Sequence, residues 1–525
     1  MNDLSPITSR RRWATLAVAC LAALLLSVDV TVLHLALPQL VADLRPSSTQ
    51  ILWIGDAYGF ALAGLLITMG NVGDRIGRKR LLLVGAVAFG AASAVTAYAP
   101  TPELLIAARV LLGVAGATIM PSTLSIIRNV FTDPKERTTA VGLWSGMGAA
   151  GFALGPVVGG LLLGRFWWGS VFLINLPVML LILLVGLVVL PESRNPAAGR
   201  VDLVSVPLSV IGVIGVIYAV KEAAVHGLVT GGVLVPGVVG IAALALFARR
   251  QTRLAEPLID VRLFGRRAFT ASVGANLVAI FGMSALSLIF AWYFQLVLGW
   301  SPLRAGLAGL PGGMSAAVGG VLAAGLITRW GRARVVALGL ALAAAAFACY
   351  SQIALDTPYL YFLAPMIVCG VGIGLTFTVT NDTVLASVPR ERAGAAAAIS
   401  ETSFELGGAL GIAVLGSVLT GVYRGELRLP AGLPGEVAVP VGESLPTALE
   451  AAATLPGQLG EAVAEAARTA FVTGVEVTAI TAAVTIAVLA AVSLVSLRGV
   501  PDVIPEELLA EPHRSPAPGE GAPAS

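Results

Sequence analysis

Long apolar segments follow one another along almost the whole chain, and they constrain the fold more than any other feature. They run from Trp13 to Leu497 and are separated only by short charged or proline-rich breaks. A helix that crosses the hydrocarbon core of a bilayer needs about 20 apolar residues, and most of these runs reach that length. Charged residues make up 12% of the 525 residues, which is about half of their share in soluble proteins. The sequence therefore predicts an all-α membrane protein.

The alternation of apolar runs and charged breaks predicts fourteen transmembrane helices. The first run follows three arginines and has no small-residue cleavage site at its end, so we interpret it as a retained span and not as a signal peptide. The spans are expected near residues 13–37, 51–71, 81–98, 103–126, 139–163, 168–190, 204–221, 231–248, 270–297, 303–328, 335–355, 359–386, 396–421 and 475–497.

Basic residues are distributed unevenly between the two sets of loops. The set that contains the N-terminus holds 25 Lys and Arg, the opposite set holds 7, and Arg109 lies within a span. Because loops rich in Lys and Arg stay in the cytoplasm, both termini are expected to be cytoplasmic, in a multi-pass protein of the inner (cytoplasmic) membrane. The N-terminal segment 1–12 and the Pro-rich tail 498–525 then lie inside the cell, and the polar composition of the tail predicts disorder.

Three sequence matches share nearly one offset and predict an internal repeat. PKER (134–137) matches PRER (389–392) at an offset of 255, and DRIGRKR (74–80) matches TRWGRAR (328–334) at 254. A glycine pattern beginning at Phe152 recurs at an offset of 256. Residues 13–190 and 270–497 are therefore expected to form two pseudo-symmetric six-helix bundles, with two helices inserted at 204–248.

Two six-helix halves of this kind are typical of rocker-type secondary transporters, which bind substrate between the halves near the bilayer midplane. The outer loop 422–474 contains EAVAEAARTAF, which can form a surface helix. This loop either shields the outer mouth of the transporter or merely connects two spans, and the sequence leaves both interpretations open.

Several motifs along nearly the whole chain resemble one family. They are VDVTVLHLALP (28–38), QILWIGDAY (50–58), GNVGDRIGRKR (70–80), RVLLGVAGA (109–117), GFALGPVVGG (151–160), FLINLP (172–177) and SETSFELGGALG (400–411). Together they resemble the fourteen-span drug:proton antiporters, the multidrug exporters of the major facilitator superfamily. The resemblance implies the major facilitator fold and proton-coupled efflux of small amphipathic, often cationic, drugs. It also implies a monomer that uses the proton gradient and no cofactor.

Five acidic residues lie within predicted spans: Asp29, Asp56, Asp382, Glu401 and Glu405. A charged side chain at the bilayer centre costs about 2.5–3.5 kcal/mol, so such acids normally face a cavity. Burial disfavours the charged form of a carboxyl group, which allows it to take up and release protons near neutral pH. These acids are therefore candidates for proton coupling and for cation binding.

Asp29 and Arg109 are the candidate proton-coupling pair. Asp29 lies roughly 12 Å from the outer end of its span and Arg109 about 9 Å from the end of its own, so the two can meet at similar depth. The resemblance places both in motifs associated with proton coupling. The alternative is a static ion pair that holds two helices in register.

Glu401 and Glu405 are the main candidates for substrate binding. They are one helical turn apart and project from one face, where two like charges suit a site that exchanges a proton for a cation. The alternative is that they reach toward basic residues of the cytoplasmic loop.

Asp56 is expected either at the cavity mouth or in solvent at the interface, and His34 either relays a proton or packs through a hydrogen bond. Asp382 favours a structural pair with Arg390 or Arg392.

Two glycine-rich motifs predict movement and close packing. In GNVGDRIGRKR the resemblance implies a gate that ties the inner ends of the halves together. Small residues at four-residue spacing in the fifth span allow helices to approach closely, and its proline permits a bend. The resemblance adds that this second pattern marks antiporters and not uptake carriers. The gate residues are Gly73, Asp74, Arg75 and Arg78, and the antiporter residues are Gly151, Gly155, Pro156, Gly159 and Gly160.

Other functions lack support in the sequence. It contains no GxxxxGK or HExxH motif, and its three cysteines lie inside apolar runs at spacings that suit neither a metal site nor a disulfide framework, so no enzyme activity, metal or nucleic-acid partner is expected. Within transport, the alternatives are an uptake symporter and a dedicated exporter of one metabolite or self-made antibiotic. A membrane receptor or intramembrane enzyme is the alternative from another class. The tenth span lacks a carboxylate, which leaves open whether multiply charged cations are accepted.

Overall fold

The computed structural model describes residues 8–194, 202–226, 230–254, 257–430, 433 and 435–501, and these residues form a bundle of helices. Short helical turns at Val261–Gly265, Tyr293–Val297 and Arg390–Arg392 connect some of them. The helices are α1 (Ser9–Leu44), α2 (Ser48–Ile76), α3 (Arg78–Ala97), α4 (Pro102–Val130), α5 (Pro134–Leu163), α6 (Ser170–Leu173), α7 (Asn175–Val189), α8 (Ser205–His226), α9 (Gly231–Gln251), α10 (Arg267–Trp292), α11 (Pro302–Tyr350), α12 (Tyr359–Ala386), α13 (Ala393–Glu426), α14 (Gly435–Glu443), α15 (Leu445–Ala453) and α16 (Gly457–Ser496).

Thirteen helical segments of the described residues are long and apolar enough to cross a membrane, with α6 and α7 together forming one of them. The 49 residues of α11 would extend about 74 Å as one straight helix, more than twice the thickness of a hydrocarbon core. Its backbone leaves helical geometry at Gly331 (φ 78°, ψ 160°), so α11 turns there and crosses twice. Counting α11 twice gives fourteen spans, which confirms the predicted number.

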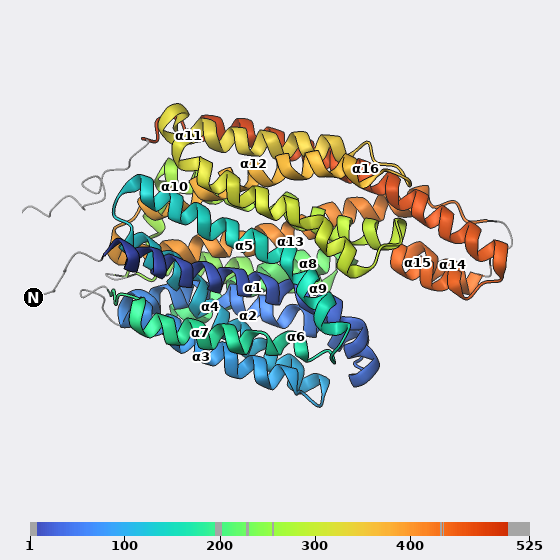
Figure 1. The fold of residues 1–525 in the computed structure, drawn as a ribbon, viewed down its shortest axis with the longest axis horizontal. Helices are drawn as coiled ribbons and strands as arrows, with labels where there is room; N and C mark the ends of the chain where they lie inside the picture. Colours follow the sequence, from blue (N-terminus) through green and yellow to red (C-terminus); the bar gives the residue numbers. More distant parts are fainter. Residues whose placement is uncertain are drawn as a thin grey trace, which may run out of the picture.

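Helix α1 begins and α16 ends at the same end of the bundle, as Figure 1 shows. The short helices α14 and α15 lie at the opposite end and pack beside the first turns of α16. The segment EAVAEAARTAF, which we expected as a surface helix of the outer loop, is instead the beginning of α16, which runs without a break from Gly457 into the final span.

Each half of the molecule has its own apolar core, one formed mainly by α1–α7 and the other mainly by α10–α13 and α16. The halves meet most closely where α5 crosses the first arm of α11. A Cβ atom at Gly142 would collide with the backbone of Gly320, and one at Gly146 would collide with Ala317. Glycine at these positions therefore lets the two backbones touch.

The predicted repeat is visible in the backbone. Gly77, between α2 and α3, and Gly331, in the kink of α11, both have positive φ (112° and 78°) and are 254 residues apart. Each is followed by an arginine, Arg78 or Arg332, whose side chain is fully buried. The two halves thus make the same tight turn at the same place, where glycine avoids the strain of a positive φ.

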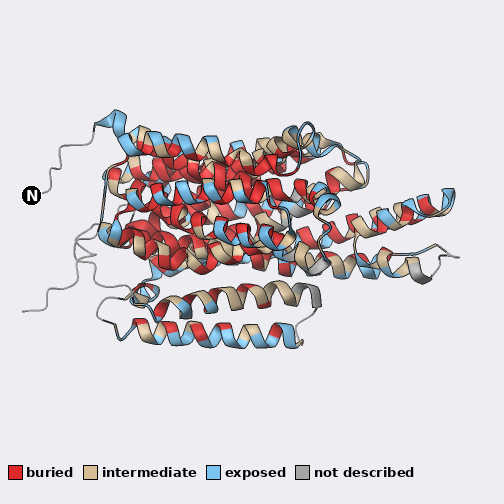
Figure 2. Cartoon of the chain, turned by 90° about the horizontal axis from the view of Figure 1, so that it is seen from below, coloured by how far each residue is buried: buried red, intermediate tan, exposed pale blue. Residues whose placement is uncertain are grey.

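The inserted helices α8 and α9 form a hairpin along one flank of the molecule, at the lower edge of Figure 2. At one end Arg250 donates hydrogen bonds of 2.6 and 2.9 Å to Asp202, and these bonds hold the pKa of Asp202 below its usual range. Helix α8 faces both halves, because Val213 and Ile217 share an apolar cluster with Phe60 of α2 and Ala409 of α13.

Candidate functional site

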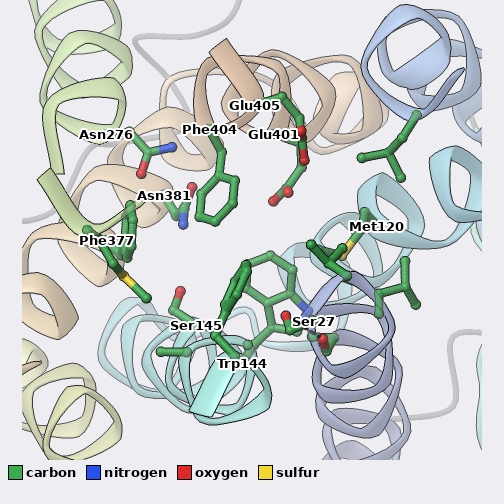
Figure 3. Close-up of a pocket in the computed structure, with 18 of the residues that line it drawn as sticks. Ser27, Met120, Trp144, Ser145, Asn276, Phe377, Asn381, Glu401, Phe404 and Glu405 are labelled. Carbon is green, nitrogen blue, oxygen red and sulfur yellow. Dashed lines mark hydrogen bonds between the residues drawn. The ribbon is translucent and has the colours of Figure 1, made fainter. Parts of the chain in front are cut away.

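A cavity lies between the two halves of the molecule. It contains about 740 Å³ of space not filled by atoms, part of it open to solvent. Its walls come from α1, α2, α4 and α5 of one half and from α10, α12 and α13 of the other. In Figure 3, Glu401, Phe404 and Glu405 lie on one side and Trp144 and Ser145 on the opposite side.

Two carboxylates face the cavity. Glu401 and Glu405 both line it from α13, as expected for residues one helical turn apart, and Glu401 is 8% exposed. Among the described residues, no side chain or backbone group donates a hydrogen bond to either carboxylate, and no basic residue forms a salt bridge with them. They therefore point to the cavity and not to the basic loop that precedes α13, which was the alternative.

Aromatic rings from both halves line the same cavity. The rings of Phe152 (α5) and Phe404 (α13) stack with their centroids 6.3 Å apart, and Phe377 (α12) is 5.7 Å from Phe404. Trp144 (α5) also lines the cavity and donates a hydrogen bond of 3.1 Å to Thr123. Because an organic cation binds well over an aromatic face next to a carboxylate, these walls suit a flat, positively charged molecule. The sequence analysis missed the aromatic residues, since Phe and Trp are common in any span.

Polar side chains extend the carboxylate side of the cavity. Asn276 (α10) donates hydrogen bonds of 3.2 Å to the hydroxyl groups of Ser400 and Ser403, and Ser400 in turn donates to Asn381 (α12). Both asparagines line the cavity. The buried Oδ1 of Asn276 has no hydrogen-bond partner among the described residues. The two asparagines and the two glutamates give this side of the cavity its polar character.

Asp29 and Arg109 meet inside the first half, as their depths predicted. Oδ2 of Asp29 lies 3.5 Å from Nη1 of Arg109, and both side chains are nearly completely buried. Oδ1 of Asp29 accepts a hydrogen bond of 2.7 Å from Asn175 (α7), which also bonds to Ser93 (α3) at 3.0 Å. Asp29 is not among the cavity-lining residues. Asn175 belongs to the motif FLINLP, but nothing in the spacing of that motif pointed to Asp29.

Tyr58 (α2) stands between the buried pair and the cavity. Its ring lines the cavity, and the guanidinium carbon of Arg109 lies 4.8 Å from the ring centroid. Arg109, which lies on α4, also donates a hydrogen bond of 3.1 Å to the backbone oxygen of Ile54 on α2. A molecule in the cavity therefore touches a side chain that touches Arg109, which in turn faces Asp29.

Asp56 (α2) has a partner that the sequence analysis did not anticipate. It forms a salt bridge with Lys221 of the inserted helix α8, and the side chains are 33% and 36% exposed, respectively. Asp56 is not among the residues that line the cavity. The acid is thus neither free in solvent nor on the cavity wall, but joins the inserted hairpin to the first half.

Asp74 joins the two halves at the end of the bundle where α1 begins. Its carboxylate accepts hydrogen bonds from the backbone of Gly394 (2.9 Å) and Ala395 (3.1 Å) at the start of α13. Arg78 donates to the same carboxylate at 2.6 Å and to the backbone oxygen of Arg390 at 2.8 Å. Of the predicted gate residues, Asp74 and Arg78 therefore contact the other half directly. Gly73 packs against Leu81 and Ser122 of the first half, and Arg75 occupies the last turn of α2.

The predicted partners of Asp382 (α12) were wrong. Its carboxylate forms salt bridges of 2.7 Å with Arg137 of α5 and with Arg332 of α11, and not with Arg390 or Arg392. The close contact of α5 with α11 brings Arg137 across the interface, while Arg392 faces Asp260 at 3.7 Å. This cluster is a second tie between the halves. It lies at the same end of the bundle as Asp74.

The glycine pattern of α5 lies against α1 and α11. Gly151, Gly155 and Gly159 face α1, where a Cβ at Gly151 would come within 2.5 Å of the backbone oxygen of Leu24. Pro156 and Gly160 face the first arm of α11. The predicted close packing is therefore present, with α5 pressed against one helix from each half.

Two further expectations concern His34 and metals. The side chain of His34 lies outside the described residues. Within the described part of the chain, no group of three or more His, Cys, Asp or Glu is placed to hold a metal ion.

Known proteins resemble this chain over most of its length. The sequence model of the Major Facilitator Superfamily matches residues 19–412. The multidrug efflux pump LfrA of Mycolicibacterium smegmatis is 43% identical over 497 residues, which cover 94% of this chain and 98% of LfrA. The methyl viologen resistance protein SmvA of Salmonella typhimurium is 35% identical over 462 residues, which cover 88% of this chain and 93% of SmvA.

The fold has a counterpart among solved structures. The crystal structure of the human organic anion transporter MFSD10 superposes with a TM-score of 0.61 at 15% identity, covering 93% of this chain and 99% of that one. At such low identity the likeness supports the fold alone. Together with the fourteen spans and the sequence matches, it leads to one assignment. The chain is a multi-pass membrane protein of the Major Facilitator Superfamily and belongs to its fourteen-span drug:proton antiporter family, whose members are transporters and not enzymes.

Proposed function

We propose that this protein exports small amphipathic, often cationic, compounds from the cytoplasm in exchange for protons. The observation that carries the proposal is the central cavity, where Glu401 and Glu405 have no basic partner among the described residues and face aromatic rings from both halves. Carboxylates without a counter-ion in such a site bind either protons or a cation. Binding of the one therefore displaces the other.

The cavity is built for a molecule that is both apolar and charged. The stacked Phe152 and Phe404 offer flat apolar surface contributed by both halves. A ring face within about 6 Å of a cation attracts it, and the attraction grows when water is excluded. The names of LfrA and SmvA, a multidrug efflux pump and a methyl viologen resistance protein, support this choice of substrate.

Proton coupling is assigned to Asp29 as well as to the glutamates. Asp29, Arg109 and Tyr58 form a chain of contacts that ends at the cavity wall. Protonation of Asp29 would release Arg109 from its counter-ion and change how Arg109 sits over Tyr58. The state of Asp29 and the occupancy of the cavity would then influence each other, which is what coupling requires.

We assign the end of the bundle that holds Asp74 and Asp382 to the cytoplasm, because the loops at that end contain most of the basic residues. Both termini are then cytoplasmic. The clusters around these two acids tie the halves together on the inside, so they would have to break before a substrate enters from the cytoplasm.

The test is efflux from a host that lacks its own pumps. Expression should lower the accumulation of ethidium, and a protonophore should abolish the effect. Glu405→Gln removes one cavity charge and should abolish ethidium efflux, whereas Glu450→Gln, which changes an exposed carboxylate on α15, should not. If no cation in a broad panel is exported, the proposal fails and a dedicated exporter of one metabolite takes its place.

A further inference from the structure

Lys221 is a partly exposed cation on α8, one of the two inserted helices that lie outside the repeat. It lies near the outer end of α8, in the inserted hairpin, and α8 packs between α2 and α13. Its ammonium bonds to Asp56, and Nζ lies 5.2 Å from the ring centroid of Phe60. Leu406, which follows the cavity-lining Glu405 on α13, packs against the apolar cluster to which Val213 and Ile217 of α8 belong, so the helix that carries Lys221 contacts the helix that carries Glu405.

The surroundings of this ammonium resemble those of the substrate we proposed. It sits over an aromatic ring and next to a carboxylate, which is the arrangement that attracts an organic cation to the cavity. Asp56 lies on α2 and the two glutamates lie on α13, and α8 packs against both helices. Lys221 forms a salt bridge with Asp56 and none with either glutamate, so its charge acts on the glutamates only through space.

We propose that Lys221 is a resident competitor that sets the affinity and charge selectivity of the cavity for cations. This inference rests on the proposed function. An arriving cation meets the repulsion of Lys221 in addition to the attraction of the glutamates. Its binding is therefore weaker than the glutamates alone would give, and its release to the outside is easier.

A purely structural role makes a different prediction. If Lys221 only clips α8 to α2, loss of either partner of the salt bridge should have the same consequence. If Lys221 acts as a competitor, the two losses have opposite consequences. Lys221→Met removes the repelling charge and should strengthen cation binding. Asp56→Asn takes away the strongest counter-ion of Lys221 and should weaken cation binding, because the freed ammonium then turns to Glu405.

The experiment measures binding to the purified full-length chain in nanodiscs at one fixed pH. Tetraphenylphosphonium serves as a permanent monocation and methyl viologen as a dication. Lys221→Met should bind the monocation roughly tenfold more tightly than the wild type, as expected for one unit charge acting across a partly hydrated site. Because the repulsion scales with the charge of the ligand, the gain for the dication should be about the square of the gain for the monocation.

Matched variants separate charge from shape. Lys221→Arg keeps the charge and should bind both probes within about twofold of the wild type. Lys221→Gln removes the charge and should show the same gain as Lys221→Met, so it replaces Lys221→Met if Lys221→Met folds poorly. The proposal is overturned if Lys221→Met and Asp56→Asn change affinity in the same direction, or if the mono- and dication gain equally. It is also overturned if neither variant differs from a wild type that binds both probes. A wild type that binds neither probe would instead refute the proposed function.

Discussion

The tie between Asp74 and α13 leads to a quantitative prediction. Asp74 accepts two hydrogen bonds across the interface, from the backbone of Gly394 and Ala395. Hydrogen bonds to charged groups contribute about 1.5–3 kcal/mol each. Asn at this position has one neutral acceptor oxygen in place of two charged ones, so Asp74→Asn should remove about 2 kcal/mol from the closed state. That loss shifts the equilibrium toward an open cytoplasmic end roughly 30-fold.

The open population can be followed through a thiol in the cavity. Cys20, Cys349 and Cys369 are first replaced by serine, and Ser145→Cys then places one thiol on the cavity wall. Inverted membrane vesicles expose the cytoplasmic side to a membrane-impermeant maleimide. Because only the open state admits the reagent, the labelling rate should rise with the open population, by about the same factor of 30 when Asp74→Asn is added.

Asp260→Asn is the matched control. Asp260 forms a partly exposed salt bridge of 3.7 Å with Arg392 at the same end of the molecule. Exposed salt bridges contribute about 0–1 kcal/mol, so labelling should rise by less than about fivefold. An Asp74→Asn variant that labels no faster than the control would refute the assignment of Asp74 as a tie between the halves.

Three further outcomes are expected. Asp29→Asn should insert and fold but fail to drive uphill export in proteoliposomes with an imposed pH gradient, and undiminished uphill export would exclude Asp29 from coupling. Gly146→Ala should lower the melting temperature, because overpacking costs about 1–3 kcal/mol and the added methyl group collides across the α5–α11 contact, whereas Gly148→Ala, with its nearest neighbour 3.8 Å away, should not. Asp202→Asn should lower the melting temperature equally at about pH 5 and about pH 8. The reason is that the hydrogen bonds from Arg250 depress the pKa of Asp202, so their stabilisation is complete above the unfolded pKa and is lost only in stronger acid; a loss seen at one pH alone would contradict this.

The fold could be predicted because its causes are repeated along the chain. Fourteen apolar runs and three matches at nearly one offset were enough to locate the two halves, and Gly77 and Gly331, which are 254 residues apart, agree with it in the backbone. The placement of Glu401 and Glu405 on one face follows from helix geometry alone, so it too was accessible from the sequence.

The partners of the buried charges could not be predicted in the same way. Asp382 bonds to Arg137, which is 245 residues away and in the other half. Only the packing of α5 against α11 brings the two together, and no local pattern encodes that contact. Lys221 was missed for the same reason, because near the end of an apolar run a lysine is indistinguishable from an ordinary interfacial anchor.

The position of α8 restricts how the two halves can rotate. It touches α2 and α13 at once, while these helices themselves meet near Gly70 and Gly394. If the two halves rotate against each other, α8 cannot keep its contacts with both α2 and α13 unchanged. The contact of α8 with α13 is apolar and therefore non-directional, so the two helices can slide past each other. The contact of α8 with α2 includes the salt bridge between Lys221 and Asp56, which depends on the two side chains staying close. If the halves rotate against each other during transport, we therefore expect the hairpin to stay with the first half and the contact between α8 and α13 to shift.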